Sequence, residues 1–252
     1  FKLSAYEGYD KSINKYGINL YYFNWGSMKG ENFDESIKYL QIGSDKGFID
    51  SIYELGKYYA NADMPTPINA KLGERYVRIS AESGYADAIG YYGTLLSDGV
   101  GVEMDIDRAI KYFKIAISKG SSVAMNDYAF LLNVGKFVKT NYKKARKYYK
   151  MAIEKGNIDA MVNYAMMFEE GEGVKVNYQI AIKYYKMAID KGDCVAMNNY
   201  AQMLEEGRGV EVDYQEAIKY YKMAIDKGET ASMRSYAMML ENGKGVEVNY
   251  QE

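Results

Sequence analysis

Residues 177–192 read NYQIAIKYYKMAIDKG, and residues 213–228 repeat them almost unchanged as DYQEAIKYYKMAIDKG. The two copies are 36 residues apart, and the last letters of the chain, NYQE from Asn249, begin the same text again. A fixed period of this length is typical of a repeat protein, in which each unit buries its apolar face against the next. The chain is therefore predicted to be a single array, and we expect its function on a surface rather than in a catalytic cluster.

The same period can be followed towards the start of the chain through glycines that close each unit, among them Gly156, Gly120, Gly84 and Gly47. It predicts about seven units, with complete ones at residues 12–47, 50–84, 85–120, 121–156, 157–192 and 193–228 and partial ones at 1–8 and 229–252. Terminal units of a solenoid carry polar caps. Since neither end falls at a unit boundary, we expect the sequence to be an excerpt of a longer protein.

Each unit is predicted to contain two helices. Between residues 160 and 192, apolar residues recur at helical spacing in two stretches, which are separated by a short loop. The first helix is expected to end at Gly171, because glycine adopts the left-handed capping conformation without strain. Asn177 and Asp213 are predicted to cap the second helices, and Glu216 is predicted to complete a capping box with Asp213. This pattern indicates an all-α fold.

Composition excludes several classes of function. The formal net charge is −2, so no overall basic field attracts nucleic acid. The single cysteine, Cys194, cannot form an internal disulfide, which favours a reducing compartment and hence the cytoplasm. No apolar run approaches the roughly 18 residues that would suggest a membrane span.

No catalytic, cofactor-binding or metal site is predicted. The chain contains no histidine, so Cys194 lacks the usual base of a nucleophilic site, and we interpret it as a small residue tolerated at a helix start. Glu169, Glu205 and Glu241 recur at equivalent positions, but successive layers of helices lie about 8–10 Å apart, too far to share one ion. The sequence therefore predicts that the protein is not an enzyme.

These glutamates lie at the negative ends of their helices, where a carboxylate is unfavourable. Two hypotheses account for them. Lys175, Arg208 or Lys244 pairs with them, or basic residues of a partner do.

The sequence resembles the Sel-1-like repeat, a relative of the tetratricopeptide repeat. One unit carries the whole pattern of that family: Ala88, Tyr92, Gly93, Gly99, Gly101, Val102, Asp105, Ala109, Tyr112, Phe113, Ala116 and Gly120. One local departure is Phe137, which replaces the second loop glycine. The resemblance implies an α/α superhelical solenoid of antiparallel helix pairs, with an adaptor or scaffold role and with first helices lining a concave face.

A candidate binding surface follows from the first helices. At 100° per residue, Ala124, Tyr128 and Leu132 share one arc, which is predicted to be core. The opposite arc changes from unit to unit and is predicted to bind a protein or peptide, with amides bonding its backbone and methionines packing on its side chains. The predicted surface consists of Thr94, Asn126, Asp127, Phe130, Asn163, Met166, Asn198, Asn199, Gln202, Arg234 and Met238.

Two alternatives remain open at this stage. Phe130 and Met166 could simply pack against the next unit. The array could also be a structural element that packs or polymerises within a larger assembly, since the near-identity of the last units suits a spacer as well as a binding site.

The second helices are predicted to face solvent with their charged side chains. Lys147, Lys150 and Glu154 project together in one unit, as do their equivalents in the next. Because acidic residues interrupt the basic ones, we interpret this face as a solvated surface, with no nucleic acid as partner.

Overall fold

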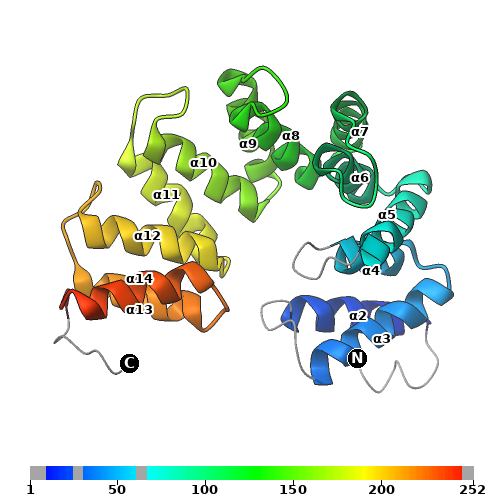
Figure 1. Ribbon diagram of the computed structural model, residues 1–252, viewed down its shortest axis with the longest axis horizontal. Helices are drawn as coiled ribbons and strands as arrows, with labels where there is room; N and C mark the ends of the chain where they lie inside the picture. The colour runs from blue at the N-terminus through cyan, green and yellow to red at the C-terminus, as the bar shows by residue number, and fades with distance from the viewer. Residues whose placement is uncertain (1–9, 25–30, 61–66, 246–252) are drawn as a thin grey trace. The chain divides into compact units, whose positions relative to one another are not determined.

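The computed structural model describes residues 10–24, 31–60 and 67–245 (Figure 1), and within these ranges the chain forms helices and no strands. The first helices of the repeats are α2 (Asp10–Asn24), α4 (Ile49–Ala60), α6 (Ala86–Asp98), α8 (Ser122–Val134), α10 (Ile158–Glu170), α12 (Cys194–Glu206) and α14 (Thr230–Glu241). The second helices are α3 (Glu31–Asp45), α5 (Pro67–Glu82), α7 (Ile106–Ser118), α9 (Tyr142–Glu154), α11 (Tyr178–Ile189) and α13 (Tyr214–Ile225). The prediction of an all-α solenoid built from helix pairs is confirmed. The partial unit predicted at residues 1–8, and the last residues of the chain from Asn249, lie outside the described ranges.

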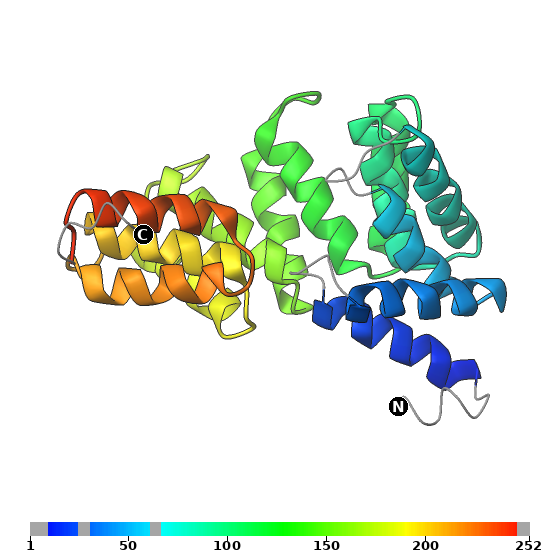
Figure 2. The ribbon, with the colours of Figure 1, turned by 60° about the horizontal axis from the view of Figure 1, so that its bottom comes forward.

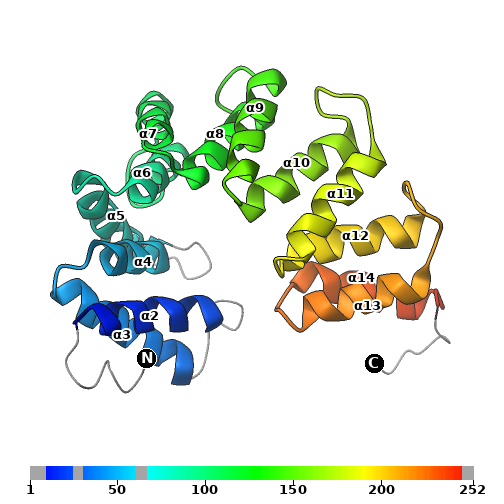
Figure 3. The same ribbon diagram turned by 180° about the vertical axis from the view of Figure 1, so that it is seen from behind.

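The helices belong to two compact units. The first comprises Phe1–Leu131 and Lys136–Lys139, and the second comprises Leu132–Gly135 and Thr140–Glu252. In the first unit, α2 to α7 each pack against their neighbours along the chain, as Figure 3 shows for α2, α3 and α4. In the second unit, α9 to α14 do the same, and Figures 1 and 2 show α12, α13 and α14 side by side.

Side-chain caps fix where the second helices begin. The side-chain oxygens of Asn177 and Asp213 accept hydrogen bonds from the backbone N–H groups three residues on, at 3.1 and 2.9 Å, as predicted. The predicted capping box is wrong in its second half. The backbone N–H of Asp213 donates instead to the carbonyl of Leu204, at 3.0 Å, because the loop folds back onto the end of the first helix. Glu216 therefore has no free donor to satisfy at that amide.

Large aromatic residues and alanines alternate in the core of the second unit. The rings of Tyr149, Tyr185 and Tyr221 recur every 36 residues and are fully buried. Ala181 and Ala188 lie one helical turn on either side of Tyr185 and are also fully buried. Each fully buried ring contributes about 1.5–3 kcal/mol to folding, and the alanines allow helices to approach closely enough to cover it.

Where a loop has its second glycine, at positions 101, 173, 209 and 245, that glycine lies against the second helix of the preceding repeat. Gly209 has a φ of 75°, and a Cβ atom added there would lie 2.3 Å from the Cβ atom of Tyr178, the first residue of α11. Gln179 strengthens this contact, because its side-chain amide donates to the carbonyl of Gly209 at 2.7 Å. The sequence predicted these glycines from the turn alone, and the structure adds a close approach between repeats.

Replacing Gly209 by alanine should therefore cost more than replacing a glycine that only turns the chain. Gly156 is the matched control, since its φ is 84° and an added Cβ would meet nothing within 4 Å. Both variants suffer left-handed strain of about 1–2 kcal/mol, and G209A adds a steric clash of about 1–3 kcal/mol. Urea unfolding should show a clearly lower midpoint for G209A than for G156A. Equal losses in the two variants would contradict the close approach.

Candidate binding surface

In the first unit, the predicted surface gathers around Asp127 on α8. Its carboxylate accepts hydrogen bonds from the hydroxyl of Thr94 on α6, at 2.8 Å, and from the side-chain amide of Asn126, at 3.1 Å. Asn126 is buried, with 7% of its surface exposed, whereas the ring of Phe130 is 52% exposed. The hydrogen bond from Thr94 links α6 to α8, and Phe130 is the exposed side chain beside it.

In the second unit, the predicted surface residues on α10, α12 and α14 differ in exposure. Met238 and Arg234 on α14 are exposed, Met238 to 55%. Asn163, Met166 and Gln202 are half-buried, and Met166 packs partly against the core cluster of this unit. Met166 therefore contacts the core of the unit and is also partly exposed to solvent.

Two asparagines on α12 form contacts inside the second unit. Asn198 is only 6% exposed, and its side-chain oxygen accepts a hydrogen bond from the hydroxyl of Ser232 on α14, at 2.9 Å. Its amide donates to the side-chain oxygen of Asn199, at 3.2 Å, and the amide of Asn199 lies 3.5 Å from the hydroxyl of Tyr185. The amide of Asn198 therefore links α12 to α14. Because the side chains of Asn126 and Asn198 are both buried, they are not accessible to a partner.

A carboxylate, a tyrosine and a cation meet between successive repeats of the second unit. The hydroxyl of Tyr185 on α11 donates to Glu169 on α10, at 2.5 Å, and the guanidinium of Arg208, from the loop after α12, donates to the other oxygen of Glu169, also at 2.5 Å. The next layer repeats the arrangement with Glu205, Tyr221 and Lys244, at 2.9 Å for both hydrogen bonds. We call each set an inter-repeat triad.

The inter-repeat triads explain two of the recurrent glutamates, Glu169 and Glu205. Each lies in the last turn of a first helix, where the helix dipole disfavours negative charge, and a cation from the following repeat compensates for it. Of the two hypotheses derived from the sequence, pairing within the chain is the one the geometry supports, through Arg208 and Lys244. Lys175 is not part of either triad.

Burial raises the pKa of Tyr185 well above its ordinary value, and the adjacent Glu169 carboxylate raises it further. The pKa of Tyr221 is raised for the same two reasons, with Glu205 as the carboxylate. Both tyrosines therefore remain protonated donors at neutral pH.

An earlier layer of the second unit has a different arrangement at the equivalent positions. Asn133 stands where the later layers have glutamate, and Glu172 stands where they have the cation. The side-chain amide of Asn133 donates to the carboxylate of Glu172 at 2.5 Å. Donor and acceptor have exchanged places, so the contact between repeats is kept.

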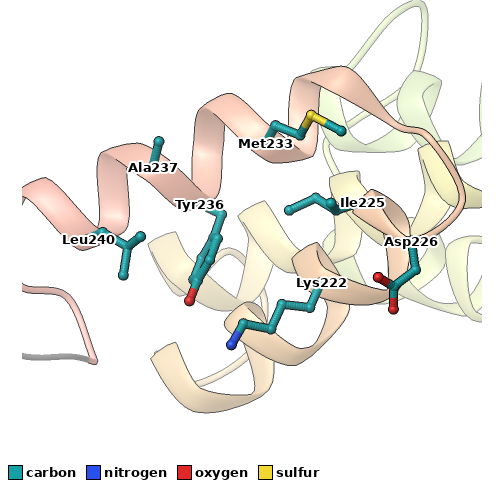
Figure 4. Close-up of a pocket in the computed structure, with 7 residues that line it drawn as sticks. All are labelled: Lys222, Ile225, Asp226, Met233, Tyr236, Ala237 and Leu240. Atoms are coloured by element: carbon teal, nitrogen blue, oxygen red, sulfur yellow. The ribbon is translucent and has the colours of Figure 1, made fainter. Parts of the chain in front are cut away.

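A hollow lies beside α14, lined by Lys222, Ile225, Asp226, Met233, Tyr236, Ala237 and Leu240 (Figure 4). The ammonium group of Lys222 lies 5.2 Å from the ring centre of Tyr236. In α12, the residue equivalent to Tyr236 is Tyr200, which is buried and packs edge-on against Tyr220 of α13 at 5.1 Å. The hollow therefore lies on the face of α14 that is equivalent to the covered face of α12 in the preceding repeat.

The described residues form no group of histidine, cysteine and carboxylate side chains that could hold a metal ion. The thiol of Cys194 is half-buried and lies 3.9 Å from the carboxylate of Glu229. Burial raises its pKa, and the carboxylates of Asp193 and Glu229 raise it further, so the reactive thiolate is disfavoured. None of the described helices is both long and apolar enough to cross a membrane.

The tyrosine of the inter-repeat triad should make stability depend on alkaline pH. Because the folded pKa of Tyr185 is raised, its contribution is fully present below the unfolded value of about 10 and is lost as the pH rises above it. The variant Y185F should lose about 1.5–3 kcal/mol at neutral pH, the value of a hydrogen bond to a charged group. Denaturant unfolding between about pH 8 and 11 should then show a smaller alkaline loss for Y185F than for the wild type. An identical alkaline loss in both proteins would show that Tyr185 does not donate to Glu169.

The chain matches the family model described as Sel1 repeat seven times, at residues 10–48, 49–85, 86–121, 122–157, 158–193, 194–229 and 230–252. A search of curated proteins found no match.

Solved structures share the fold. A Sel1 repeat protein from Oxalobacter formigenes superposes with a TM-score of 0.68 at 25% identity, covering 95% of this chain and 94% of its own. A protective antigen present in uropathogenic Escherichia coli strains, with an SLR fold, gives a TM-score of 0.64 at 24% identity, and the match covers all of this chain but 53% of the antigen. An immunity protein from Pseudomonas aeruginosa gives a TM-score of 0.57 at 19% identity, covering 81% of this chain and 73% of its own.

Proposed function

Because the chain belongs to the Sel1 repeat family, we propose that it is a non-enzymatic scaffold that binds a protein or peptide through the exposed face of its first helices. Proteins built from Sel1 repeats generally serve as scaffolds for protein–protein interactions. Among the described residues, the carboxylates that could suggest chemistry, Glu169 and Glu205, are engaged in the inter-repeat triads. Their role in packing is what favours a scaffold over a catalyst.

The single observation that carries this proposal is the exposure of large apolar side chains on the first helices. Phe130 in the first unit and Met238 in the second are each more than half exposed. Exposed apolar groups beside polar ones are a common feature of interaction sites. Methionine suits such a surface because its flexible thioether adapts to different partners.

Polar neighbours would give the surface its selectivity. Arg234 is exposed next to Met238, and Gln202 and Asn163 are partly accessible on α12 and α10. Arginine and amide side chains can bond the backbone carbonyls and N–H groups of an extended peptide. Asn126 and Asn198 form hydrogen bonds within the chain beneath this surface. In the proposal they do not contact the partner directly.

A photo-crosslinking amino acid at position 130 or 238 tests the proposal. Control positions are Ile115 on α7 and Met223 on α13, which are exposed apolar residues of second helices. A partner should crosslink from positions 130 and 238, and the variants F130S and M238Q should reduce its binding about tenfold, while changing stability by less than about 0.5 kcal/mol.

Two results would contradict the proposal. One is crosslinking of the same partner from positions 115 and 223 alone. The other is unfolding of F130S, which would make Phe130 a core residue. The alternative of an element that packs or polymerises within a larger assembly stays a prediction.

A further inference from the structure

The outward face of α9 is basic along its whole length. Lys143, Lys144, Lys147 and Lys150 are exposed, Arg146 is half-buried, and the helix contains one acidic residue, Glu154, in its last turn. This concentration of charge belongs to a chain whose net charge is −2. The sequence-based interpretation was a solvated surface in which acidic residues interrupt the basic ones, and on α9 this interruption is limited to Glu154.

Equivalent positions in the later repeats show that the fold does not require two of these cations, Lys143 and Arg146, whereas Lys147 and Lys150 recur as lysines. Lys143 is replaced by Gln179 and Gln215 in α11 and α13, and Arg146 is replaced by Ile182 and Ile218. Both isoleucines are buried, with 7% of their surface exposed. An arginine in this place gives up the apolar burial that isoleucine provides, so the fold alone does not account for it.

The cations of α9 are also not used in ion pairs between repeats. Arg208 and Lys244 form ion pairs with glutamates of the preceding repeat, at 2.5 and 2.9 Å. Among the described residues, none of the five basic side chains between positions 143 and 150 forms such a pair. A surface depression runs along them, lined by Lys143, Arg146, Lys147, Lys150, Met151 and Glu154.

We propose that this depression, the α9 basic groove, binds an acidic peptide segment of a partner protein. Side-chain carboxylates would pair with Lys143, Arg146 and Lys147, and an apolar side chain would pack on Met151, which is half-exposed. Arginine suits this role because its planar guanidinium binds a carboxylate through two parallel hydrogen bonds.

A peptide fits the groove better than a nucleic acid does. From position 143 to 150 a helix rises only about 10 Å, too short for the roughly 6–10 phosphate contacts that support strong nucleic-acid binding. Glu154 lies at one end of the groove, and its equivalents Asp190 and Asp226 directly follow α11 and α13. The groove lies on a second helix, so it is independent of the surface proposed on the first helices.

The test is a fluorescence-anisotropy titration with a labelled peptide of alternating glutamate and leucine. The variant K143Q/R146I introduces the residues that the later repeats carry at these positions, and adding K144Q removes a third charge. The triple variant should weaken binding about tenfold or more, as expected for three surface ion pairs. Arg146→Ile alone should also raise the thermal midpoint, because it restores the buried isoleucine of the other repeats.

The matched control is R75Q/K111Q/K114Q, which removes the same charge from exposed positions of α5 and α7. It should leave the affinity within about twofold of wild type. Equal weakening by both triple variants, or equal binding of a peptide of alternating glutamine and leucine, would overturn the proposal. Tighter binding of oligothymidine, or of phosphatidylserine vesicles, than of the acidic peptide at the same salt concentration would overturn it as well.

Discussion

Successive repeats of this protein must approach one another closely, and the rest of the structure depends on that constraint. A single helix pair cannot bury its own apolar face, so each repeat supplies small or fitted surfaces for the next. In the second unit this is visible at Gly209, which lies against the first residue of α11, and at Ala181 and Ala188, which flank the buried ring of Tyr185. The second loop glycines and the buried tyrosines recur along the array, and they make this contact.

The close approach also brings polar groups into the space between repeats, and these groups need partners. The inter-repeat triads supply them by combining a carboxylate at the end of a first helix, a tyrosine of the second helix and a cation from the following loop. Hydrogen bonds to charged groups are stronger than neutral ones and are directional. The triads therefore fix the register of neighbouring repeats, whereas apolar packing alone would tolerate sliding.

Much of the fold could be predicted from the sequence because the 36-residue period is a local signal. Capping side chains such as Asn177 and loop glycines such as Gly171 act within a few residues, so their roles follow from the text. The binding surface was harder to predict. A helical wheel treats a first helix as isolated, whereas each has neighbours on more than one side, and Asn198 is buried because Ser232 of α14 reaches it. The second half of the capping box failed for a related reason, since the amide of Asp213 finds a partner on another helix.

Some residues of the array serve packing, and others do not; the two groups must be separated before a function is assigned. Glu169 recurs between repeats and the position of Asn198 varies, and either pattern suggests a site. The contacts of both residues nevertheless lie within the chain. Phe130, Met238 and Arg146 lack such an explanation and carry the two proposals. The difference between the two groups is clearest at one position of the second helices. It is a buried isoleucine in two repeats, Ile182 and Ile218, and an arginine, Arg146, in a third.

The most direct measurement of the central claim is a double-mutant cycle between Glu169 and Arg208, with E169Q, R208Q and the double variant compared by equilibrium unfolding. If neighbouring repeats are held in register by the inter-repeat triad, the coupling free energy should be about 1 kcal/mol or more. Additive effects of the two substitutions, with a coupling near zero, would contradict this account.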